Sequence, residues 1–99
     1  MNTHAVPNYI IENTIQYIVQ NLAGNLSLDT IAQELHISPS HLSRTFKKAT
    51  SCSLTEYINK ERIHKAKELL HNTDLLTYEI AEAVGYKDAT YFSFDFPEI

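Results

Sequence analysis

The sequence predicts an all-α protein in which two helix-turn-helix modules are joined by a long connecting helix. The first indication is an internal repeat: residues 31–37 (IAQELHI) recur 49 positions later as residues 80–86 (IAEAVGY), with apolar side chains in the same places. The second is that apolar residues recur at helical spacing along the chain. The third is that 2 glycines and 3 prolines in 99 residues leave little room for hairpins or a β-sandwich. A helical unit repeated in tandem indicates paired modules.

The first module is predicted over residues 1–52. Its first helix is expected over residues 8–22, where isoleucine, valine and leucine side chains lie at helical spacing. Pro7 suits the first turn of that helix, where a missing N–H costs nothing. Gly24 suits its end.

Two shorter helices follow within the first module. Ser27 is expected to cap the first of them, whose first turn holds Asp29 near the positive end of the helix dipole. Ser38 is expected to cap the second, with Pro39 at its first position. This second helix, over about 39–49, is the predicted recognition helix.

The connecting helix is predicted over residues 53–72. The segment Ser53-Leu54-Thr55-Glu56 has the pattern of a capping box, in which the serine and glutamate side chains each accept a backbone N–H from the other residue. Apolar residues at helical spacing are expected to face the core, while the basic residues line the exposed side of the helix.

The second module is predicted over residues 73–99. Thr77 is expected to cap its first helix, and Gly85 to end that helix, because glycine accepts a left-handed backbone conformation. Asp88 is expected to cap a last helix, which Pro97 cannot easily continue.

The net charge of −4 at pH 7 conceals a segregation of charge along the chain. Residues 36–67 hold seven basic and two acidic side chains, whereas the remainder holds ten acidic side chains and a single base, Lys87. A basic middle between acidic ends is the pattern expected of a protein that turns one face to a nucleic acid. Chance clustering on a solvated face gives the same pattern.

The chemistry of the predicted recognition helix suits the major groove of DNA, which admits an α-helix. The short side chains of Ser40 and Ser43 permit a close approach. Arg44 can donate two hydrogen bonds to one guanine, worth about 1–3 kcal/mol of discrimination. Lys47 and Lys48 are expected near phosphates, where they add affinity without sequence preference. An ordinary solvated helix face is the plainer interpretation of any one of these residues.

Two long stretches of the chain resemble the DNA-binding domain of the AraC/XylS family of bacterial transcription regulators. Residues 26–58 and 62–70 resemble its first module and connecting helix, and residues 78–88 with Tyr91-Phe92-Ser93 resemble its second-module signature. The amino-acid sequence of this signature is most similar to that of response regulators whose output domain is of this type. The resemblance implies a homeodomain-like pair of modules that insert recognition helices into successive major grooves of double-stranded DNA.

The resemblance also implies which residues contact DNA. Base-reading positions in the first recognition helix would be Ser40, Ser43, Arg44 and Lys47. In the second recognition helix they would be Ala89, Thr90 and Ser93. Phosphate contacts are expected from Ser38, His41, Lys48 and Lys87. The chain would act in the cytoplasm as an output module, with its regulation elsewhere in the system.

The sequence departs from the family after Ser93. Arg44, Lys47 and Lys48 of the first copy align with Phe94, Pro97 and Glu98 of the second. We therefore expect a shortened, acidic second recognition helix, with the last helix of the family missing. The second module should be the less stable one and should favour self-association through the C-terminal end. The chain should then bind one half-site, and bind it weakly.

Other classes of function fit the residues less well. No histidine has a nucleophile or carboxylate partner at a motif spacing, so we expect no enzyme. The spacing of ligands for a metal site is absent, Cys52 is the single cysteine, and no apolar run is long enough to span a membrane. We expect neither metal nor cofactor. The main alternative is a helical protein-interaction module, for example one that contacts RNA polymerase and binds little DNA itself.

Overall fold

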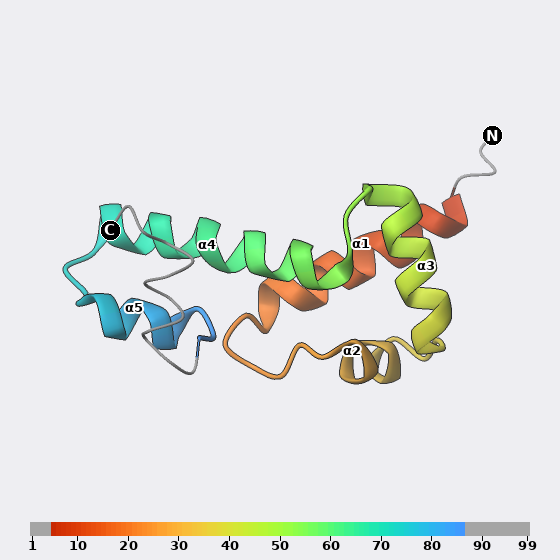
Figure 1. Ribbon diagram of the computed structural model, residues 1–99, viewed down its shortest axis with the longest axis horizontal. Coiled ribbons are helices and arrows are strands. Elements are labelled where there is room, and N and C mark those ends of the chain that lie inside the picture. Colours follow the sequence, from red (N-terminus) through yellow and green to blue (C-terminus); the bar gives the residue numbers. More distant parts are fainter. Residues whose placement is uncertain (1–4, 87–99) are drawn as a thin grey trace.

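The computed structural model describes residues 5–86 (Figure 1). That range contains five α-helices and no strand, which confirms the predicted all-α class. The helices are α1 (Ala5–Gln20), α2 (Leu28–Glu34), α3 (Pro39–Thr50), α4 (Leu54–Asn72) and α5 (Thr77–Ala83). No helix within residues 5–86 is long and apolar enough to cross a membrane.

The connecting helix α4 separates two apolar clusters. Its 19 residues give it a length of about 28 Å, and Figure 1 shows α1, α2 and α3 gathered at one end of it and α5 at the other. The first cluster is built around Ile18, Ile31, Leu42 and Phe46, all fully buried. The second is built around Ala66 of α4 with Ile80 and Ala81 of α5 and its C-cap, Val84. Each module therefore has its own small core, and α4 belongs to both.

The internal repeat of the sequence is also a repeat of backbone hydrogen bonds. After both α2 and α5 the chain forms a Schellman motif, in which the first two residues past the helix cap bond back to its last turn. The bonds are His36 N to Gln33 O at 3.2 Å and Ile37 N to Ala32 O at 3.0 Å in the first copy, and Gly85 N to Glu82 O at 3.2 Å and Tyr86 N to Ala81 O at 2.9 Å in the second. The left-handed position is occupied by His36, with φ 60°, and by Gly85, with φ 102°. The first copy therefore makes the turn without a glycine.

Three of the five predicted N-caps are confirmed, and a further one, Asp88, lies outside the described residues. Ser27, Ser38 and Ser53 each accept a backbone N–H three residues later, at 3.1 Å in every case. Glu56 completes the capping box by accepting the N–H of Ser53 at 2.9 Å.

The fourth predicted cap, Thr77, is wrong. Thr77 is the first residue of α5, and Leu76 takes the N-cap position. A leucine side chain has no acceptor, so the only side-chain bond at this helix start is from Leu76 N to Glu79 Oε1, at 2.8 Å. The sequence pointed to Thr77 because its hydroxyl can accept a backbone N–H. The N-cap is decided by the extended backbone conformation, and the residue with that conformation is Leu76.

Candidate nucleic-acid interface

Helix α3 has one buried face and one exposed face. Leu42 and Phe46 are 0% exposed, and the Phe46 ring meets Tyr57 of α4 edge-on, with 5.3 Å between ring centroids and 70° between ring planes. These contacts fix the rotation of α3 about its own axis, as does its packing against α1 and α2. The exposed face carries Ser40, Ser43, Arg44 and Lys47. The structure thus brings these four predicted side chains onto one solvent-facing surface.

The N-terminal end of α3 is closed by its own cap. The Ser38 hydroxyl accepts the N–H of His41, at 3.1 Å, so this oxygen is occupied as an acceptor while its proton stays available to donate. The side chains of Ser38 and His41 are both exposed. A phosphate at this end could therefore take the serine O–H and the imidazole.

The basic groups of α3 are not neutralised by carboxylates. Within residues 9–86, the single ion pair joins Lys65 Nζ and Glu68 Oε1 on α4, at 2.8 Å. Arg44, Lys47 and Lys48 are exposed. Lys47 and Lys48 lie in the last turn of α3, where positive charge is favourable to the helix dipole. Their ammonium groups are thus available to a polyanion.

Arg62 differs from the other basic residues of α4. The expectation that the basic residues of this helix line its exposed side holds for Lys60, Lys65 and Lys67, but it is wrong for Arg62. The guanidinium donates from Nε to the backbone oxygen of Leu22 at 3.2 Å and from Nη2 to that of Gly24 at 3.5 Å. Burial lowers the pKa of Arg62. The hydrogen bonds of its guanidinium hold α4 against the linker between α1 and α2.

The predicted contacts of the second module lie outside the described residues. These are Lys87, Ala89, Thr90 and Ser93, and the expected truncation of the last helices falls in the same region. The structure therefore describes a complete α2–turn–α3 unit, and of the second unit α5 and the turn that follows it.

Comparison with known proteins identifies the domain. A sequence profile described as a helix-turn-helix domain matches residues 31–99. An uncharacterised HTH-type transcriptional regulator of Bacillus subtilis, YtdP, is 37% identical over the whole of this chain, which spans 13% of that protein. Five such curated relatives are all longer, and the chain spans between 13% and 36% of their lengths.

Two solved domains share both sequence and fold with the chain. The C-terminal domain of AraT, a response regulator from Geobacillus stearothermophilus, is 39% identical with a TM-score of 0.85, covering 90% of this chain and 74% of that one. The C-terminal domain of the response regulator yesN from Fusobacterium nucleatum is 34% identical with a TM-score of 0.78, covering 92% of both chains. The chain therefore belongs to the helix-turn-helix family of AraC/XylS-type, DNA-binding transcription regulators, as its sequence predicted.

Proposed function

We propose that this chain is the sequence-specific DNA-binding output domain of a bacterial transcription regulator, and that α3 is the helix that enters the major groove. The observation that carries the proposal is the pair of faces on α3. Leu42 and Phe46 anchor the helix in the core, and the opposite face presents two small hydroxyls with unneutralised basic side chains. A buried anchor holds the reading face at a fixed angle to its target.

Each exposed residue of α3 has a chemical role in this proposal. Arg44 donates two hydrogen bonds to one guanine, and Ser40 and Ser43 allow the backbone of α3 to approach the base edges. Lys47 lies at the edge between base and phosphate contacts. Ser38, His41 and Lys48 contact phosphates, which sets the register of the helix without reading sequence.

The second module would extend the site along the same DNA face. By resemblance, Lys87 would contact phosphate, and Ala89, Thr90 and Ser93 would read bases. Two complete recognition helices would read half-sites about one helical turn apart, about 34–36 Å. In a longer regulator, a receiver domain in the bacterial cytoplasm would control this output module, as expected for response regulators.

The test begins with selection of duplexes from a randomised library, because the amino-acid sequence does not specify the base sequence of the DNA site. The dissociation constant of the chain is then measured for the selected duplex and a scrambled one. Arg44→Ala should weaken binding to the selected duplex by about 1–3 kcal/mol, or about 5- to 150-fold, and should change binding to the scrambled duplex much less. Lys65→Ala is the matched control. Lys65 is a basic residue of α4, not of α3, and it is paired with Glu68 of the same helix.

Two results would contradict the proposal. One is a selection that enriches no sequence. The other is equal loss of affinity from Arg44→Ala and Lys65→Ala on both duplexes, because equal loss is the signature of simple charge attraction.

A contact with RNA polymerase is a second candidate function, favoured by an apolar patch at the start of α5. Leu75, Leu76 and Tyr78 are exposed by 39%, 56% and 60%. Aromatic and aliphatic side chains of this kind form the centres of protein interfaces. Tyr78→Ala should weaken binding of purified polymerase and leave DNA affinity unchanged; the reverse pattern would exclude this patch. Self-association through residues 94–99 stays a prediction that sedimentation velocity can check.

A further inference from the structure

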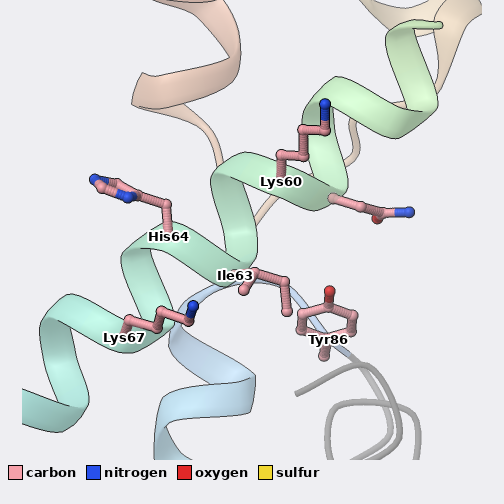
Figure 2. A pocket seen from close by; sticks show the side chains of 6 residues that line it. Lys60, Ile63, His64, Lys67 and Tyr86 are labelled. Carbon is pink, nitrogen blue, oxygen red and sulfur yellow. The ribbon is translucent and has the colours of Figure 1, made fainter. Parts of the chain in front are cut away.

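An open groove with a volume of about 430 Å³ runs beside α4, between that helix and the turn that follows α5. It is lined by Asn59, Lys60, Ile63, His64, Lys67 and Tyr86 (Figure 2). In Figure 2 Ile63 points toward the Tyr86 ring, while Lys60 and His64 project from α4 away from that ring. This surface, called the α4 groove below, is separate from the exposed face of α3.

The lining of the α4 groove suits an extended anion. Lys60, His64 and Lys67 follow one another at intervals of four and three residues, which places them along one face of the helix. All three are exposed, and among the described residues no carboxylate lines the groove. From Lys60 to Lys67 the helix rises by about 10 Å, so the two ammonium groups can reach different phosphates of one strand.

Helix α4, which carries the groove, contacts α3 directly. Glu56 lies in the first turn of α4. The pKa of Glu56 is lowered by the hydrogen bond from the Ser53 N–H and, to a smaller extent, by the charges of Lys47 on α3 and Lys60 on α4. The charges of Lys47 and Lys60 thus act on one carboxylate, which is already engaged in the cap of α4.

We propose that the α4 groove binds the sugar-phosphate backbone of the same DNA duplex whose bases α3 reads. Lys60 and Lys67 supply point charges on flexible stems, and His64 and Asn59 supply hydrogen-bond donors. The contact adds affinity and orientation without sequence preference. This inference rests on the proposed function, and it assigns α4 a part in binding beyond that of a spacer.

The salt dependence of binding tests the inference. The dissociation constant for the selected duplex is measured at several salt concentrations for the wild-type chain, for Lys60→Gln and for the double variant Lys60→Gln/Lys67→Gln. Each lost phosphate contact should reduce the slope of log K against log salt by about 0.9. The ratio of affinities for selected and scrambled duplexes should not change. Lys60→Arg should restore the slope, because it restores the charge.

Lys65→Gln is the matched control for charge. It removes the same charge from the same helix, but Lys65 is paired with Glu68 and does not line the groove. Its slope should equal that of the wild type. A slope for Lys60→Gln and for the double variant that equals the Lys65→Gln slope would overturn the inference.

The failure of this inference can be told apart from failure of the proposed function. If Arg44→Ala abolishes sequence preference while the groove variants keep the wild-type slope, only the inference on α4 fails. If no variant of α3 or α4 affects binding, the proposed function fails with it. A thermal unfolding midpoint for every variant shows that each compared chain is folded.

Discussion

Gly85 and Arg62 are packed so closely that a side chain at position 85 would displace the guanidinium. A Cβ added to Gly85 would lie 2.8 Å from Arg62 Nε and would also strike the backbone oxygen of Leu22. That oxygen is the one to which Arg62 Nε donates, at 3.2 Å. Helix α4, the linker between α1 and α2, and the turn after α5 therefore meet at one point. The two modules are joined there by contact as well as by the chain.

Gly85→Ala should destabilise the domain strongly. The left-handed backbone at φ 102° already disfavours an L side chain by about 1–2 kcal/mol, and the contact with Arg62 and Leu22 adds to that cost. Gly24→Ala is the control: a Cβ at Gly24 would meet its nearest atom, the Asn21 oxygen, at an ordinary 3.4 Å. Its effect should stay within about 1 kcal/mol. Chemical denaturation gives both values, and equal effects would contradict the packing described for Gly85.

Arg62→Met should separate the fastening role of this residue from its charge. Methionine keeps much of the apolar stem but leaves the carbonyls of Leu22 and Gly24 without their donor, which should cost about 1–3 kcal/mol. Lys65→Met, on the exposed side of the same helix, should change stability by less than about 1 kcal/mol. The free energy of unfolding from urea titration measures both. An effect of Arg62→Met no larger than that of Lys65→Met would show that the hydrogen bonds from Arg62 to Leu22 and Gly24 do not stabilise the fold.

Leu76→Ser should stabilise the second module. Leu76 has φ −75° and ψ 158°, close to the values of the three serine caps, so a serine would fit the same backbone. A hydroxyl there could accept an N–H of the first turn of α5, a bond worth about 1 kcal/mol. The leucine is 56% exposed, so little apolar burial is lost. A higher thermal midpoint is expected, and a lower one would mean that Leu76 has a packing role.

Stability should fall in acid partly through Glu56. The folded-state pKa of Glu56 is lowered from 4.5, first by the hydrogen bond from the Ser53 N–H. Its contribution is therefore fully present above about pH 4.5 and is lost as the pH falls through the lowered folded value. Glu56→Gln keeps an acceptor for the cap but has no charge to lose. The thermal midpoint of the variant should drop less than that of the wild type between pH 5 and pH 3; parallel curves would rule out this role for Glu56.

The sequence predicted the helices and the faces of α3 because both follow from local patterns. Apolar spacing turned Leu42 and Phe46 inward, and serine caps placed the starts of α2, α3 and α4 correctly. Arg62 could not be predicted in this way. Its charge counted toward a basic surface, but its partners are backbone oxygens 38 and 40 residues away, which no local pattern shows.

The left-handed backbone conformation of His36, though not the turn itself, was missed for a related reason. Glycine signals such a turn by its lack of a side chain, whereas His36 adopts φ 60° because the Schellman bonds and the packing of Ile37 on the first core hold it there. The α4 groove depends on Tyr86 coming beside α4 from the turn after α5, a tertiary contact that helical spacing does not contain.

The central claim is that DNA lies on the exposed face of α3, and an NMR titration tests it most directly. The ¹⁵N-labelled chain is titrated with the selected duplex, and the change in each amide signal is mapped onto the helices. The largest changes should fall on residues 38–48, which are the N-cap of α3 and most of that helix, with small changes on the exposed side of α1 around Glu12 and Val19. If α1 or α5 shifts most while α3 is unperturbed, α3 is not the reading helix.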